Sequence, residues 1–126
     1  MSKYSDPRRL MLSVQINHTL IPNTLVDPRA AINVMTRETM DSLTLFSLKQ
    51  TPIVLQLVSR STIKPKGNLE DVVILIISWE YPTKFMILKP NYSLGGYPLI
   101  LGRPWLATTR AHISCRSCTM TIFHKA

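Results

Sequence analysis

The apolar residues of this chain fall into many short runs, and residues that favour turns separate these runs. The longest purely aliphatic run covers only residues 72–77, whereas a helix that crosses a bilayer needs about 20 apolar residues. Short runs rich in Val, Ile and Leu between turn residues are typical of β-strands. We therefore expect an all-β domain whose sheet closes or folds over on itself, and we expect no membrane partner.

In each expected strand, apolar and polar residues alternate or β-branched residues are frequent. These strands are residues 10–16, 19–26, 30–35, 53–58, 61–66, 69–78, 84–88, 98–101, 111–115 and 118–123. Asn17 and His18 predict a tight turn between the first two strands. Pro22 confines the second strand to an edge or an irregular position, because proline cannot donate to a ladder.

Two short helices complete the expected fold. Thr36 can cap a helix that runs to Leu43, and Pro104 fits the first position of a helix that runs to Thr109. Two further turns are predicted, a projecting hairpin at residues 65–68 and a turn at residues 80–82.

The length of 126 residues suits one domain, with a polar arm at residues 1–9 and the domain at residues 10–126. With 45% hydrophobic residues the chain can build a core. The first nine residues are polar and basic and lack the apolar centre of a signal peptide. Two cysteines cannot form a disulfide scaffold, so we expect a reducing, cytoplasmic location.

The chain is basic, with fifteen Lys and Arg against seven Asp and Glu and a formal net charge of +8. The cations are spread almost evenly along the sequence, with tight groups at residues 8–9 and 64–66 alone. A nucleic-acid reader normally concentrates its charge on one face or interleaves it with stacking aromatic residues. We therefore expect a basic surface without a nucleic-acid partner.

No metal or cofactor is expected. Cys115 and Cys118 form a single C-x-x-C pair, for which His112 and His124 are the nearest completing ligands, and such a pair is more often incidental at a hairpin turn. The four glycines, at 67, 95, 96 and 102, do not form a phosphate-binding loop.

Asp27 is the acid that stands out by its context. It lies between the apolar runs 24–26 and 30–35, where an ionisable side chain is costly unless it is paired or functional. A structural role is the alternative, in which Asp27 ends a strand and accepts hydrogen bonds from turn amides. On this context alone the structural role is favoured.

Several segments together resemble the retropepsin-like aspartic peptidases, especially the protease segment of plant retrotransposon (gag-pol type) polyproteins. The resemblance covers about residues 10–123 and rests on the joint order and spacing of its parts. These parts are Leu25-Val26-Asp27-x-x-Ala30-x-Ile32-Asn33-Val34-Met35, Ile63-x-x-x-Gly67-x-Leu69-Glu70-Asp71-Val72, Phe85-x-Ile87-Leu88, residues 98–108 (PLILGRPWLAT), Ala111-x-Ile113 and residues 119–122 (TMTI).

The resemblance implies a closed β-barrel domain that forms a homodimer and hydrolyses a peptide or polyprotein substrate. Each subunit would supply one Asp27, and the two carboxyl groups would share a proton and activate water. The resemblance further assigns a flap over the substrate to the hairpin at Lys66, Gly67 and Asn68. It assigns support of the active-site loop to the strand Ile100, Leu101 and Gly102.

The active-site loop departs from the family pattern, which is Asp, Ser or Thr, Gly, Ala and usually a further hydroxyl residue. Here the loop reads Asp27-Pro28-Arg29-Ala30-Ala31. Pro28 replaces a hydroxyl group and lacks an amide donor, and Arg29 replaces a glycine, so that any positive φ or close approach at this position would be strained. The guanidinium of Arg29 also favours ionisation of both carboxyl groups, which opposes the sharing of one proton.

Two hypotheses therefore remain open. In the first, the chain is an aspartic endopeptidase domain whose activity is greatly reduced or absent because its loop is degenerate. In the second, it is a pseudo-peptidase that binds peptides or dimerises through the same groove without turnover.

Overall fold

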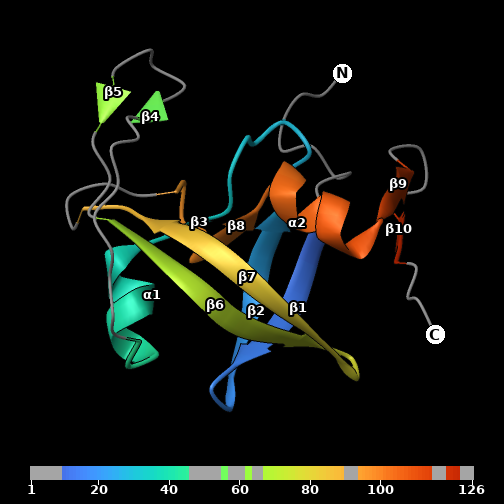
Figure 1. Cartoon of the computed structure of the whole chain (residues 1–126), viewed down its shortest axis with the longest axis horizontal. Helices are drawn as coiled ribbons and strands as arrows, with labels where there is room; N and C mark the ends of the chain where they lie inside the picture. Colours follow the sequence, from blue (N-terminus) through green and yellow to red (C-terminus); the bar gives the residue numbers. More distant parts are fainter. Residues whose placement is uncertain are drawn as a thin grey trace.

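The computed structural model describes residues 10–45, 55–56, 62–63, 67–89, 94–114 and 119–122 (Figure 1). Its centre is a closed barrel with the strand order β1-β2-β8-β3-β7-β6, beside the two-stranded sheets β4-β5 and β9-β10. The strands are β1 (Leu10–Ile16), β2 (Thr19–Val26), β3 (Val34–Met35), β4 (Leu55–Gln56), β5 (Thr62–Ile63), β6 (Gly67–Ile76), β7 (Trp79–Ile87), β8 (Leu99–Leu101), β9 (His112–Ser114) and β10 (Thr119–Thr121). The helices are α1 (Arg37–Ser42) and α2 (Arg103–Thr109). The expected all-β class, the closed barrel and the two short helices are confirmed.

The hairpin β1–β2 forms as predicted. Asn17 and His18 both have positive φ, 49° and 66°, as a two-residue type I′ turn requires. The pairing shifts register between Leu12 and Val14, so Pro22 lies in the irregular part of the ladder. A proline without an amide donor is tolerated there, as expected.

The long ribbon β6–β7 corrects two predicted turns. The chain reverses at residues 77–78, where Ile77 has a φ of 59°, and not at residues 80–82. Pro82 instead lies within β7 opposite Val73. The hairpin predicted at residues 65–68 is wrong for Gly67 and Asn68, because β6 already begins at Gly67. Lys66 lies outside the described residues.

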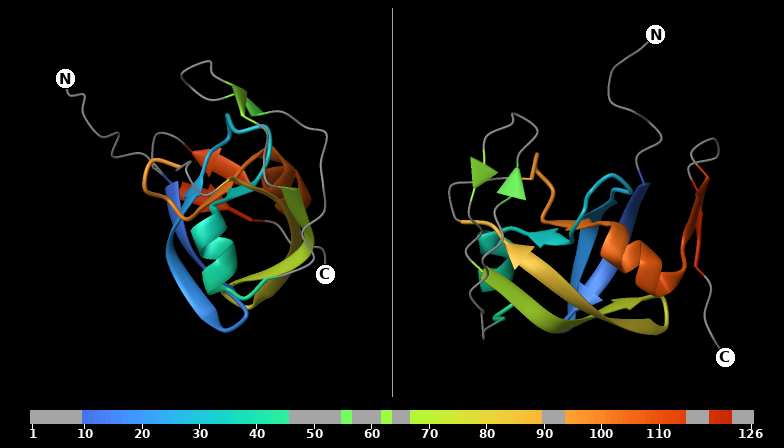
Figure 2. Two further views of the ribbon diagram at one scale, coloured as in Figure 1. Left: turned by 90° about the vertical axis from the view of Figure 1, so that its left-hand side faces the viewer. Right: turned by 45° about the horizontal axis from the view of Figure 1, so that its top comes forward.

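Helix α1 begins where its cap predicts. Thr36 Oγ1 accepts a hydrogen bond from the backbone N–H of Thr39 (3.2 Å), and Glu38 places an acid in the first turn. Met40 of the helix and its C-cap residue Leu43 are buried in the barrel core. Figure 2 shows α1 across one end of the barrel.

The last part of the chain also follows the predictions. Pro104 lies in the first turn of α2, and the helix ends at Arg110, which has a φ of 54°. The strands β9 and β10 pair with each other in antiparallel fashion, as expected for a closing hairpin. The Cys115 and Cys118 pair lies outside the described residues. No described group of three or more His, Cys, Asp or Glu side chains could hold a metal ion.

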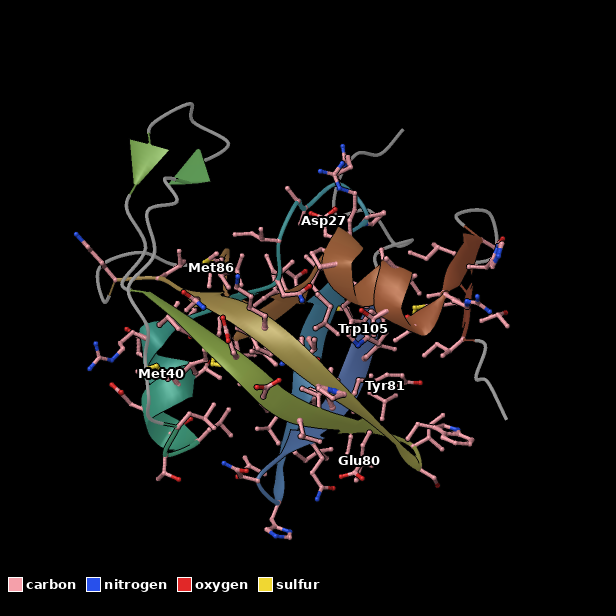
Figure 3. The ribbon with its side chains drawn as sticks, viewed as in Figure 1. Asp27, Met40, Glu80, Tyr81, Met86 and Trp105 are labelled. Atoms are coloured by element: carbon pink, nitrogen blue, oxygen red, sulfur yellow. The ribbon has the colours of Figure 1, made fainter. Side chains whose placement is uncertain are left out.

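The barrel interior is filled by side chains from nearly every strand. The largest fully buried hydrophobic side chains include Phe85 of β7, Leu99 of β8 and Trp105 of α2. Each contributes roughly 1.5–3 kcal/mol through burial of apolar surface. Tyr81 meets Trp105 edge to face, with ring centroids 6.0 Å apart (Figure 3). None of the described helices is long and apolar enough to span a bilayer.

The buried side chain of Tyr81 predicts a loss of stability at alkaline pH. Burial raises the pKa of Tyr81 above its ordinary value of about 10. As the pH rises past about 10, the unfolded chain loses this proton first, and the stabilisation that is complete at lower pH is lost. The melting temperature should therefore fall more steeply between about pH 9 and 11 in the native chain than in Tyr81→Phe. Equal slopes would contradict this assignment.

Candidate active-site loop

The strand β8 lies between β2 and β3, the two strands that the loop of residues 27–33 connects. It pairs in parallel with β2 and antiparallel with β3, so Ile100 lies opposite both Leu25 and Val34. The chain leaves β2 at Val26, loops outward, and returns through β3 on the other side of β8 (Figure 1). The loop of residues 27–33 is therefore held at both of its ends by one short strand.

Asp27 is the first residue of this loop and is positioned by the sheet. Its backbone N–H donates to the carbonyl oxygen of Leu101 (2.9 Å), which extends the β2–β8 pairing by one residue. Its side chain is half-buried, on the side of the barrel where α2 begins (Figure 3). The structure thus brings Asp27 together with Leu101, one of the residues predicted to support it.

The segment from Asp27 to Ala30 is a tight turn. The N–H of Ala30 donates to the carbonyl oxygen of Asp27 (3.1 Å), and the N–H of Arg29 donates to Asp27 Oδ1 (2.9 Å). Pro28 occupies the second position of the turn, where its fixed φ is favourable. Asp27 therefore accepts from a turn amide, as its structural alternative predicts, and this bond also fixes the direction of the carboxyl group.

The positive φ that would strain the backbone at Arg29 does not occur. Arg29 is not among the described residues with positive φ, so a side chain is accommodated in this turn. The close approach for which a glycine is needed occurs instead at Gly102. A Cβ atom there would lie 2.5 Å from the carbonyl oxygen of Ile32 and 2.7 Å from that of Ala30. The N–H of Arg103 donates to the same Ala30 oxygen (2.9 Å), which closes the loop onto the start of α2.

Asn33 is a second fixed point of the loop, which the sequence did not single out. Its side chain is 4% exposed. Asn33 Oδ1 accepts from the N–H of Gly102 (2.8 Å), and Asn33 Nδ2 donates to the carbonyl oxygen of Lys84 (3.1 Å). One amide group thus ties the loop to both β7 and the start of α2. The signal in the sequence was a single asparagine between the apolar residues Ile32 and Val34.

The residues expected to form a flap do not contact this loop through any described hydrogen bond. Gly67 and Asn68 are buried in the barrel wall and lie opposite Ile87 and Met86 of β7. The described hairpin that projects from the barrel is β4–β5, in which Leu55 lies opposite Ile63. Figures 1 and 2 show it outside the barrel, on the side toward which the loop after β2 extends.

Comparison with solved structures gives the same architecture. The model matches the retroviral protease-like domain of Ddi1 from Leishmania major with a TM-score of 0.70 and 19% identity, over 90% of this chain and 89% of that one. It matches a retropepsin-like aspartic protease from Rickettsia conorii with a TM-score of 0.61 and 18% identity, over 82% and 74% of the two chains. It matches the EIAV protease complexed with the inhibitor HBY-793 with a TM-score of 0.68 and 21% identity, over 90% and 99%.

These matches establish a retropepsin-like fold. No protein-family model matches the sequence, and no curated protein sequence matches it.

Substitution of Gly102 tests the close approach between α2 and the loop. Gly102→Ala forces a Cβ against two backbone oxygens, and we expect it to lower the free energy of unfolding by roughly 2–4 kcal/mol. Gly95→Ala is the matched control, because that position is open and only its φ of +67° opposes a side chain, which costs about 1–2 kcal/mol. Urea unfolding measures both. Similar losses for the two variants would contradict the crowding at Gly102.

Substitution of Asn33 by aspartate tests the amide bridge. Asn33→Asp keeps the acceptor for Gly102 but removes the donor to Lys84, and it buries a charge at neutral pH. We expect a loss of roughly 2–4 kcal/mol at pH 7. Burial raises the pKa of an introduced carboxyl, so its protonated form restores a donor below that pKa, and the loss should shrink toward pH 4.

Asn17→Asp is the control for the same change at an exposed site, where Asn17 Nδ2 donates to the carbonyl oxygen of Leu43 (3.2 Å). Thermal melts of both variants at pH 4 and pH 7 should show the pH-dependent loss for position 33 alone. A loss at position 33 that does not depend on pH would contradict the bridge.

Proposed function

We propose that this chain is the aspartic-endopeptidase domain of a plant retrotransposon polyprotein, in a form whose hydrolytic activity is greatly reduced or absent. The observation that carries the proposal is the position of Asp27. It follows the barrel strand β2, is fixed by the Leu101 carbonyl, and lies in a retropepsin-like fold. Two of the matched structures are proteases, one of them with a bound inhibitor.

In the proposed mechanism two copies of the chain meet with their Asp27 loops face to face. Two carboxyl groups at about 3 Å cannot both ionise at low cost, so one remains protonated while the other accepts a proton from water. The water attacks the peptide carbonyl carbon, and the protonated carboxyl stabilises the oxygen that gains charge. The proton taken from water then passes to the peptide nitrogen as the C–N bond breaks, so that the products are a carboxylic acid and an amine. The Arg29 amide on Asp27 Oδ1 would hold each carboxyl group in a fixed orientation for this step.

The side chains after Asp27 oppose this chemistry. Pro28 has neither the hydroxyl group nor the amide donor that could join the two loops across the dimer. Arg29 introduces a permanent cation two residues from Asp27, at a position where the family pattern has an uncharged glycine. Ala31 is exposed and offers no side-chain hydrogen bond.

A second candidate function is supported by the geometry of the same turn. Pro28 and Arg29 fit the turn without positive φ, and the bonds from Gly102 and Arg103 hold the loop in place. A chain with this turn can therefore keep the proposed peptide groove and lose its chemistry. Such a pseudo-peptidase would act as a peptide-binding or dimerisation module. In either case we propose that the hairpin β4–β5 covers the bound peptide, in place of Gly67 and Asn68.

Restoration of the loop side chains tests the proposed cause of the low activity. The triple variant Pro28→Ser, Arg29→Gly, Ala31→Ser should gain hydrolysis of peptide libraries between about pH 4 and 6, by at least about a hundredfold over the native chain. Mass spectrometry of the cleaved library measures the gain. Addition of Asp27→Asn to the triple variant is the control, and it should abolish the gained activity.

Sedimentation analysis of the same proteins separates assembly from chemistry. A triple variant that forms dimers yet cleaves nothing would show that the lesion lies elsewhere. In the native chain, cleavage that is lost in Asp27→Asn supports the endopeptidase. Peptide binding without cleavage, unchanged in Asp27→Asn, supports the binding module.

A further inference from the structure

The acidic and basic residues of this chain are segregated along the sequence. Its seven acids are Asp6, Asp27, Glu38, Asp41, Glu70, Asp71 and Glu80. Residues 81–126 contain no acid, and their cations are Lys84, Lys89, Arg103, Arg110, Arg116 and Lys125. This part of the chain includes β8 and α2, the two elements that hold the Asp27 loop. The cations are spread evenly along the chain, so the asymmetry arises from the positions of the acids alone.

In the fold, the described acidic residues other than Asp27 lie on other elements than the Asp27 loop and the segment that holds it. Glu38 and Asp41 belong to α1, and Glu70 and Asp71 belong to β6. Glu80 lies near the turn of the β6–β7 ribbon, and Figure 3 shows it at the opposite side of the barrel from Asp27. Among the described residues, the loop 27–33 and the segment 94–114 therefore carry one acid, Asp27 itself.

Arg29 and Arg103 bring two cations to this loop. The bond from the N–H of Arg103 to the carbonyl oxygen of Ala30 (2.9 Å) places the Arg103 backbone beside the residue that follows Arg29, and both arginines are exposed. In the part of the chain that the structure describes, neither guanidinium has a carboxylate partner, whereas Arg37 of α1 pairs with Asp41 at 3.0 Å. With Asp27, the loop carries a formal charge of 2 − 1 = +1 in each chain.

We infer that the proposed peptide groove beside the Asp27 loop selects an acidic peptide, with Asp or Glu side chains directed to Arg29 and Arg103. This inference rests on the proposed function, which places a peptide along this loop. A guanidinium presents a planar fork of donors that matches a carboxylate and binds it more specifically than a lysine does. The charges have no carboxylate partner in the described chain, so a ligand carboxylate supplies the missing counter-ion.

The described aromatic residues favour a peptide over a single-stranded nucleic acid. Proteins that bind single strands interleave their cations with exposed aromatic rings on which bases stack. The large aromatic side chain that is exposed among the described residues is Trp79, at 50%, and it is the neighbour of Glu80 in the β6–β7 ribbon. The two arginines and the exposed aromatic ring therefore belong to different parts of the surface.

Fluorescence anisotropy with labelled peptides tests the inference on the full chain. Three peptides of equal length share one apolar framework and differ only in carrying Glu, Gln or Lys at the same positions. The Glu peptide should bind the native chain at least about tenfold more tightly than the Gln peptide, and the Lys peptide should bind most weakly. The preference should shrink as salt is added, because exposed charges are screened.

Variants then assign the preference to the two arginines. Arg29→Gln and Arg103→Gln should each weaken binding of the Glu peptide roughly three- to tenfold and leave the Gln peptide nearly unchanged. The control is Arg37→Gln, which removes the same charge from α1 and should leave both affinities unchanged. Thermal melts verify that all three variants remain folded, as expected for side chains that are not buried.

The outcomes separate this inference from the proposed function. Equal binding of the Glu and Gln peptides overturns the acidic preference and leaves the peptide groove in place. Absence of binding by all three peptides overturns the groove together with the preference. An oligonucleotide of single-stranded DNA that binds more tightly than the Glu peptide, with a steep salt dependence, overturns the peptide as the ligand.

Discussion

The close contact between Gly102 and the carbonyl oxygens of Ala30 and Ile32 is the constraint on which the rest of the site depends. The loop of residues 27–33 follows β2, and Gly102 follows the neighbouring strand β8. Their backbones approach until no room is left for a Cβ atom at Gly102. Such an approach would bury polar backbone groups without partners. Asn33 satisfies the Gly102 amide, and Ala30 satisfies the Arg103 amide. A buried donor without a partner costs about 1–3 kcal/mol, so the two bonds make the contact stable.

Much of the fold could be predicted because it depends on local chemistry. The Asn17-His18 turn, the Thr36 cap and the proline in the first turn of α2 each act within a few residues. The wrong turns show the limit of such patterns. Glu80 to Pro82 has turn composition, yet Tyr81 packs on Trp105 from another element, and this burial keeps the segment in β7. Packing with a distant residue decided the structure there.

The candidate site was predictable in part for the same reason. Asp27 stood out by its place between two apolar runs, but its proposed catalytic role, like the supporting roles of Leu101 and Gly102, came from the family resemblance. The role of Asn33 could not be found in this way, because it depends on two partners, Gly102 and Lys84, that lie 69 and 51 residues away in the sequence. The backbone conformation at Arg29 was likewise open from the sequence, because the glycine pattern of the family did not show whether φ is positive here. A turn with proline at its second position accommodates a side chain after it.

The loop thus divides its requirements between two sets of groups. Its shape depends on backbone amides and carbonyls, on Gly102 and on Asn33, and none of these requires a particular side chain at positions 28, 29 or 31. Its proposed chemistry depends on those three side chains and on a shared proton. The side chains at positions 28, 29 and 31 can therefore change while the loop keeps its shape. Because Arg29 adds to a loop with one acid a cation that has no carboxylate partner among the described residues, the change that we propose to oppose hydrolysis would also favour retention of an anionic ligand.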